Sequence, residues 1–91
     1  MRYKISHTDS FDKKVLKFFK KHQDIFDRFQ KTVILLSENP FHPSLRLHKL
    51  QGNKSNYYSV SITMSYRIIL DFIIIDEEII LIDIGSHDDV Y

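Results

Sequence analysis

The 91-residue chain has no cysteine, and it contains only two glycines and two prolines. The lack of cysteine excludes a disulfide-stabilised scaffold and any zinc site built on thiolates, and it is compatible with a reducing compartment. Because Gly and Pro are scarce and 43% of the residues are hydrophobic, the composition argues against a disordered chain. A chain of this length has room for one hydrophobic core, so we expect residues 1–91 to form a single domain.

The sequence also lacks a long uninterrupted hydrophobic run. Its first ten residues, MRYKISHTDS, place no apolar stretch behind their basic residues, which argues against a signal peptide. The apolar segments after Tyr57 are broken by Asp71 and by the acidic cluster 76–78 before the roughly 18 apolar residues of a transmembrane helix accumulate. We therefore expect a soluble, cytoplasmic protein with no membrane partner.

Charge is balanced in total but not along the chain. The formal net charge is +1, yet Arg67 is the only lysine or arginine after Asn56. This asymmetry is compatible with a surface that binds a polyanion. It is equally compatible with two helices whose lysine-rich faces are simply solvated, and composition alone leaves both interpretations open.

Alternating side chains predict three strands in the C-terminal third of the chain, because strand residues point to opposite faces in turn. The predicted apolar faces consist of Tyr58, Val60, Ile62 and Met64, then Tyr66, Ile68, Leu70, Phe72 and Ile74, then Ile80, Ile82 and Ile84. The opposite, mixed face carries the polar residues Ser59, Ser61, Arg67, Asp71 and Asp83 and leads into His87. Since the apolar face has to be covered, we expect any chemistry on the mixed face.

The first half of the chain predicts a short strand at residues 2–6 and two amphipathic helices. The apolar stripe of the first helix begins at Phe11, with a cap expected from Thr8, Asp9 or Ser10. The second helix carries Phe26, Phe29, Val33 and Leu36 on one face, with Asp24 as its expected cap.

The Asn39-Pro40 sequence is expected to end the second helix, because proline lacks an amide hydrogen and restricts the residue before it. Residues 45–52 are expected to form another short strand that ends at Gly52. The resulting order predicts an α+β domain, with two N-terminal helices packed on one face of a mainly antiparallel sheet of four to five strands.

No metal or nucleotide motif is present: the five histidines show no HExxH-like spacing, and no glycine-rich phosphate loop occurs. The remaining candidates are Arg67 and two histidines at strand ends, His48 and His87. Arginine binds phosphate through paired donors, and histidine exchanges a proton near neutrality. A base, an acid and a cation are what RNA cleavage through its own 2′-hydroxyl requires.

The same residues also allow purely structural interpretations. His48 is compatible with a partly buried strand residue, and His87 with a surface group. Arg67 is compatible with an ion pair to Asp71 or Asp83.

From Leu45 to Tyr91 the chain resembles the RelE/ParE toxin superfamily, especially its RelE- and YafQ-like messenger-RNA endonucleases. The matching segments are LRLHKLQG, YYSVSI, SYRIILDFII and IILIDIGSHDDVY, and the match is most specific at Tyr66-Arg67 and at residues 85–91. The resemblance implies the toxin of a type II toxin–antitoxin system that cleaves messenger RNA in the ribosomal A site without a metal ion or other cofactor. It also implies a cognate antitoxin as partner.

The resemblance implies a role for each matching residue. His87 would be the general acid, Arg67 would contact the scissile phosphate, and His48 would be the base. Tyr91, at the position of the family's terminal aromatic residue, would stack on or orient a nucleotide. The residues expected to bind the RNA backbone are Arg46, Lys49 and Lys54, and the basic helices between Lys13 and Lys31 would suit ribosomal RNA.

One departure separates the chain from RelE itself, which has two lysines where this chain has Ser59 and Ser61. The histidine-based chemistry of YafQ-like toxins is therefore the closer analogue. Two other functions stay open: a ParE-like inhibitor of DNA gyrase, and an inactive homologue that only binds an antitoxin. Two roles stay open as well, since Tyr91 is compatible with an apolar plug on the core and His48 with a structural residue.

Overall fold

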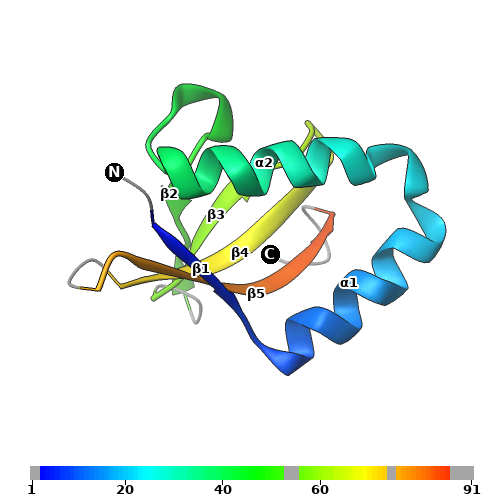
Figure 1. Cartoon of the computed structure of the whole chain (residues 1–91), viewed down its shortest axis with the longest axis horizontal. Helices are drawn as coiled ribbons and strands as arrows, with labels where there is room; N and C mark the ends of the chain where they lie inside the picture. The colour runs from blue at the N-terminus through cyan, green and yellow to red at the C-terminus, as the bar shows by residue number, and fades with distance from the viewer. Residues whose placement is uncertain (1–2, 53–55, 74–75, 87–91) are drawn as a thin grey trace.

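Two helices lie on one face of a five-stranded sheet in the computed structural model, which describes residues 3–52, 56–73 and 76–86 (Figure 1). The helices are α1 (Asp9–Lys21) and α2 (Phe26–Glu38), with short 3-10 turns η1 (Gln23–Ile25) and η2 (Pro43–Leu45). The strands are β1 (Lys4–His7), β2 (His48–Lys49), β3 (Tyr58–Ser61), β4 (Tyr66–Ile73) and β5 (Glu78–Ser86). The predicted α+β class and the packing of two helices on a mainly antiparallel sheet are confirmed.

The strands follow the order β1-β5-β4-β3-β2 across the sheet. β2, β3, β4 and β5 form antiparallel pairs with their neighbours, as short turns between consecutive strands favour. β1 runs parallel to β5, so the beginning of the chain lies beside its last strand. A parallel pair needs a long connection, and the two helices and the strands between them provide it.

The helix boundaries follow from local chemistry, with one exception to the sequence-based expectation. Thr8 caps α1, because its hydroxyl oxygen accepts a hydrogen bond of 3.0 Å from the backbone N–H of Phe11. Asp24 does not cap α2: it lies inside η1, and α2 begins after Ile25 without a side-chain cap. The expected end of α2 is confirmed, since Asn39 is its C-terminal cap.

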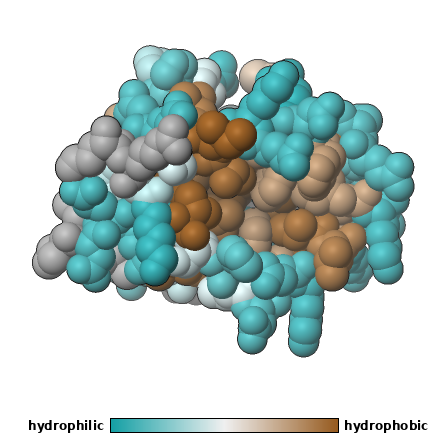
Figure 2. Space-filling view, in the orientation of Figure 1, coloured by the Kyte–Doolittle hydropathy of each residue, from teal (hydrophilic) through white to brown (hydrophobic). Residues whose placement is uncertain are grey.

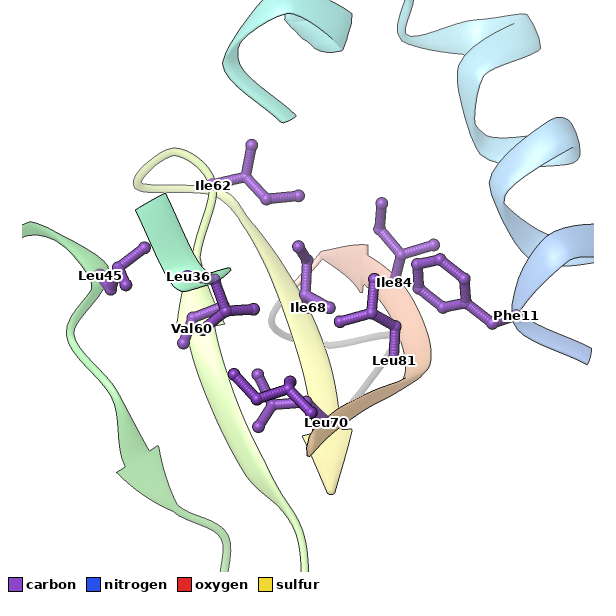
Figure 3. Close-up of a cluster of buried hydrophobic side chains, with 10 residues drawn as sticks. Phe11, Leu36, Leu45, Val60, Ile62, Ile68, Leu70, Leu81 and Ile84 are labelled. Carbon is purple, nitrogen blue, oxygen red and sulfur yellow. The ribbon is translucent and has the colours of Figure 1, made fainter. Parts of the chain in front are cut away.

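A single main core fills the space between the helices and the sheet (Figure 3). Phe11 of α1 and Leu36 of α2 reach this core from the helices, and Val60, Ile68 and Leu81 reach it from the sheet. A smaller cluster lies on the opposite face of the sheet, where Leu50 packs against Ile69 with Tyr57 and Ile82 around them. The sheet is therefore partly covered by apolar residues on both faces.

Aromatic rings join the two helices to each other. The Phe19 ring of α1 makes T-shaped contacts with Phe26 and Phe29 of α2, each with ring centroids 5.1 Å apart. Figure 2 shows the corresponding hydrophobic surface between the helices, bounded by hydrophilic side chains. Neither helix in the described ranges is long and apolar enough to cross a membrane.

Three details of the predicted strands are wrong. Met64 is 82% exposed in the turn after β3 rather than part of an apolar face. The strand expected over residues 45–52 is reduced to His48–Lys49, because η2 and a left-handed Arg46 precede it.

In β5 the alternation breaks at a bulge, since Ile69 pairs with Asp83 while Leu70 pairs with Leu81. Leu81 and Ile84 therefore both enter the main core, whereas Ile82 joins the cluster on the other face.

Candidate functional site

The guanidinium group of Arg67 is the centre of a polar cluster on the mixed face of the sheet. Its Nε donates a hydrogen bond to the Ser59 hydroxyl at 2.9 Å, and Nη1 donates to the Ser61 hydroxyl at 2.9 Å. Nη2 donates to the backbone carbonyl of Arg46 at 3.3 Å. Three neutral acceptors therefore fix the plane and position of a permanent positive charge.

His48 lies against the same guanidinium. Its Nδ1 is 3.2 Å from Arg67 Nη2 and also 3.2 Å from the Arg46 carbonyl oxygen, and its Nε2 is 3.4 Å from the Ser59 hydroxyl. A guanidinium only donates and a carbonyl only accepts, so Nδ1 bonds Arg67 when it carries no proton and Arg46 when it does. The position of one proton on His48 thus determines how the cluster is connected.

Strand register explains why these residues meet although they are distant in sequence. His48 of β2 is directly opposite Ser59 of β3, and Ser61 of β3 is opposite Arg67 of β4. Side chains that are directly or diagonally opposite on one face of a sheet are within reach of each other. The long arginine side chain can therefore bond both serines and contact the histidine. We call this group the Arg67 site: Arg67, His48, Ser59, Ser61 and the carbonyl of Arg46.

Arg46 contributes to the site through its backbone. It follows η2 and adopts a left-handed conformation with φ 50° and ψ 47°, which non-glycine residues rarely adopt. This conformation ends η2, and the Arg46 carbonyl lies within hydrogen-bonding distance of both Arg67 and His48. The Arg46 residue as a whole is exposed.

The other candidates from the sequence are not all in this cluster. Lys49 follows His48 in β2, so its side chain is on the opposite side of the strand from the Arg67 site. His87, Tyr91 and Lys54 lie outside the described residues. Asp83 pairs with Ile69, which lies on the same face of β4 as Arg67, so the register agrees with its expected place on the mixed face. Its carboxylate forms an ion pair with Lys14 of α1, at 3.0 Å.

Ser59 and Ser61 are the residues whose roles the sequence interpretation missed. The sequence shows them only as small polar residues on the mixed face and as replacements of two lysines. In the structure Ser59 is fully buried, and its hydroxyl is the acceptor for Arg67 Nε. The signal that would have identified them is the alternation along β3. Ser59 and Ser61 lie on the same face as Arg67, and Val60 between them lies on the other face.

A basic hollow of about 300 Å³ lies where α1 passes the C-terminal part of β5. Lys14, Lys17 and Lys21 line it together with His22, and Gly85 forms part of its wall. Gly85 is opposite Arg67 in the sheet. The lysine-rich face of α1 is therefore close to the strand that leads into His87.

The described part of the chain contains no group of three His, Asp or Glu side chains arranged to hold a metal ion. What the Arg67 site does offer is a fixed cation beside an imidazole. Such a pair can bind an anionic phosphate and exchange a proton next to it.

The model of a family described as bacterial YafQ toxins of type II toxin–antitoxin systems matches residues 3–91 of the chain. The chain belongs to the YafQ toxin family. No curated protein sequence matches it significantly. Membership of the family confirms the resemblance to the RelE/ParE superfamily on which the expected roles rest.

Solved structures of YafQ and of related toxins have the same fold. YafQ from E. coli strain BL21(DE3) superposes with a TM-score of 0.80 at 18% identity over 99% of both chains. The E. coli DinJ–YafQ toxin–antitoxin complex gives 0.78 at 18% identity over 100% of this chain and 99% of that chain. A toxin from Agrobacterium tumefaciens described as YoeB/ParE gives 0.75 at 17% identity over 92% of this chain and 98% of its own.

Proposed function

We propose that the chain is an endoribonuclease toxin that cleaves messenger RNA in the ribosomal A site through the RNA's own 2′-hydroxyl group. The observation that carries the proposal is the contact between a fixed guanidinium and an imidazole, with Arg67 Nη2 3.2 Å from His48 Nδ1. Membership of the YafQ toxin family supports it. The charge and the proton acceptor that the reaction needs are adjacent on one face of the sheet.

In the proposed reaction His48 accepts the proton of the 2′-hydroxyl while the 2′-oxygen attacks the adjacent phosphorus. Arg67 stabilises the negative charge that develops on the phosphoryl oxygens. His87 donates a proton to the 5′-oxygen as its bond to phosphorus breaks. The products are a 2′,3′-cyclic phosphate and a 5′-hydroxyl, and Tyr91 would stack on a base beside the cut.

The contacts of His48 favour one tautomer for this role. When Nδ1 carries the proton and donates it to the Arg46 carbonyl, Nε2 is the basic nitrogen. In the other tautomer the basic nitrogen is Nδ1, and its lone pair accepts a hydrogen bond from the Arg67 guanidinium. That lone pair is then not available to accept the proton of the 2′-hydroxyl. The proposed mechanism therefore uses the tautomer in which His48 Nδ1 donates to the Arg46 carbonyl.

We further propose that the chain acts in the cytoplasm and binds three macromolecules: an antitoxin, ribosomal RNA and messenger RNA. E. coli YafQ has been solved in complex with DinJ, which supports a cognate antitoxin for this chain. Lys14, Lys17 and Lys21 of α1, which line the basic hollow, suit the phosphates of ribosomal RNA. Lys49, Lys54 and the side chain of Arg46 are proposed to contact the backbone of the messenger RNA.

The test is induced expression in bacteria that lack the antitoxin, with transcript 5′ ends mapped in the presence and absence of translation. We expect cuts inside coding sequences that depend on translation and leave 5′-hydroxyl ends. His87→Ala should reduce cleavage about 100- to 10,000-fold, the usual contribution of general acid–base catalysis. His7→Ala is the matched control, because His7 is an exposed residue at the end of β1, the edge strand on the other side of the sheet from β2 and His48.

The alternative functions give different results in the same experiment. Growth arrest with intact transcripts and a DNA-damage response would indicate a gyrase inhibitor of the ParE type. Normal growth would indicate an inactive homologue. A fully active His87→Ala variant would remove His87 from the mechanism.

A further inference from the structure

A second cavity, of about 380 Å³, lies between α2, η2 and the end of β3. We call it the α2 cavity. Its volume is within the range of about 300–1,000 Å³ that is usual for ligand pockets. The apolar part of its lining comes from Leu35, Leu45 and Ile62. Nothing in the proposed catalytic mechanism uses this cavity.

The polar part of the lining is basic. Arg28 and Lys31 are three residues apart on α2, which places them side by side on the helix surface. Both residues are exposed, and within the described ranges no carboxylate forms an ion pair with either of them. The hydroxyl-bearing residues Thr32, Ser44 and Ser61 complete the lining. Two cations beside apolar surface suit a ligand that combines a phosphate with a flat or apolar group.

The α2 cavity and the Arg67 site share two parts of the chain. Ser61 lines the cavity and also accepts a hydrogen bond from Arg67 Nη1 at 2.9 Å. Ser44 and Leu45 line the cavity, and the next residue, Arg46, accepts a hydrogen bond from Arg67 Nη2 through its carbonyl. The α2 cavity therefore adjoins the Arg67 site at Ser61 and at the end of η2.

We propose that the α2 cavity binds the nucleotide next to the cleavage position in single-stranded RNA, with the phosphate of that nucleotide at Arg28 and Lys31. This inference rests on the proposed function, because it places the cut at Arg67. The apolar residues would contact the base or ribose, as sequence-tolerant binding of single strands requires. Arg28 and Lys31 are then substrate-binding residues and take no part in proton transfer.

The experiment measures binding and does not depend on cleavage. The probe is a short single-stranded RNA in which every 2′-hydroxyl is methylated, so the nucleophile is blocked. Its affinity is measured by fluorescence anisotropy over a series of salt concentrations. The variant Arg28→Gln/Lys31→Gln is compared with Lys13→Gln/Lys20→Gln, which removes the same charge from exposed positions of α1 outside the cavity.

For Arg28→Gln/Lys31→Gln we expect about tenfold weaker binding than for the control, and a slope of log affinity against log salt that is smaller by about 0.7 for the lost phosphate contact. The melting temperatures of both variants should stay close to that of the unmodified protein, since all four side chains are exposed. Ribosome-dependent cleavage should require more RNA substrate while its maximal rate is retained.

Three results would overturn the inference. The first is equal affinity of the two variants for the methylated RNA, and the second is no measurable binding by the unmodified protein. The third is unchanged RNA affinity with weakened antitoxin binding, which would assign the cavity to the antitoxin. Failure of the His87→Ala test would instead reject the proposed chemistry and leave this binding comparison unaffected.

Discussion

At the scale of single residues, the environment of Arg67 explains how a cation is oriented on a sheet. Its guanidinium donates hydrogen bonds to two hydroxyls and one carbonyl, which carry no charge, and contacts the His48 imidazole. Neutral oxygen acceptors orient the group, whereas a carboxylate at one of these positions would compete with a phosphate. Ser59 and Ser61 thus supply two of the acceptors that hold Arg67.

The first prediction concerns Ser59, whose hydroxyl is bonded to Arg67 Nε and lies beside His48. We expect Ser59→Ala to lower the cleavage rate about 10- to 100-fold, because a hydrogen bond to a charged group contributes about 1.5–3 kcal/mol. The rate is measured from the appearance of 5′-hydroxyl ends in a reconstituted translation reaction. Ser65→Ala makes the same chemical change at an exposed turn residue and should leave the rate unchanged. Equal rates for the two variants would show that Ser59 does not position Arg67 for the reaction.

The second prediction separates the two possible contributions of Arg46. Arg46→Gly retains the carbonyl that contacts Arg67 and His48, and glycine adopts the left-handed conformation readily. We expect the maximal cleavage rate to be retained and the free energy of unfolding to change by less than about 1 kcal/mol. RNA binding should weaken, with a salt slope smaller by about 0.7 if the side chain contacts one phosphate. A large fall in the maximal rate would contradict the assignment of the catalytic contribution to the carbonyl.

At the scale of secondary structure elements, Arg46 and His48 of the site lie where η2 ends and β2 begins. η2 stops at Arg46 and β2 begins two residues later, so the same short segment lines the α2 cavity and provides His48. The hydrogen-bonded pairing of β2 with β3 is limited to two residue pairs, which places His48 opposite Ser59. Helix α1 in turn begins directly after β1, and its start depends on the Thr8 cap.

The third prediction tests this cap. Thr8→Ala removes the side-chain acceptor for the N–H of Phe11 and should lower the free energy of unfolding by about 1 kcal/mol. Urea denaturation followed by circular dichroism measures the difference. Ser10→Ala, at an exposed position inside the first turn of α1, is the control and should have almost no effect. If the two variants were equally stable, the Thr8 bond would contribute nothing to the helix.

At the scale of the whole molecule, one small core joins both helices to β1, β3, β4 and β5. Leu36 of α2 is fully buried between the helical layer and the strands. A protein of this size has a total stability of about 5–15 kcal/mol, so a single core position accounts for a large fraction of it. The sheet that carries Arg67 is therefore rigid only while the helices remain packed on it.

The fourth prediction follows from this coupling. Leu36→Ala should lower the free energy of unfolding by about 2–5 kcal/mol, because it removes buried apolar contacts and leaves a cavity. Ile34→Ala on the same helix, at a residue that is 59% exposed, should cost much less. Thermal denaturation should show a fall of at least about 8 °C for Leu36→Ala. Similar melting temperatures for the two variants would mean that α2 does not depend on its buried face.

The amino-acid sequence by itself determined the elements and the main candidates of this protein. Apolar spacing is a local property, so it predicts the two helices, the strands after Tyr57 and the α+β class. It also places Arg67 on the less apolar face, and the closing residues 85–91 carry the resemblance to the toxin family. These features depend on neighbours in the chain, which is why they can be recognised without the fold.

Only the tertiary structure decided which side chains meet. Strand register brings His48 and Ser59 to Arg67, packing of α1 beside β5 brings Lys14 to the Asp83 carboxylate, and the end of η2 presents the carbonyl of Arg46. Register and bulges are set by pairing between distant segments, and a shift of one residue moves a side chain to the other face. The α2 cavity likewise arises where three elements meet. The spacing of residues within one element does not predict such contacts, because they form only when distant segments of the chain pack together.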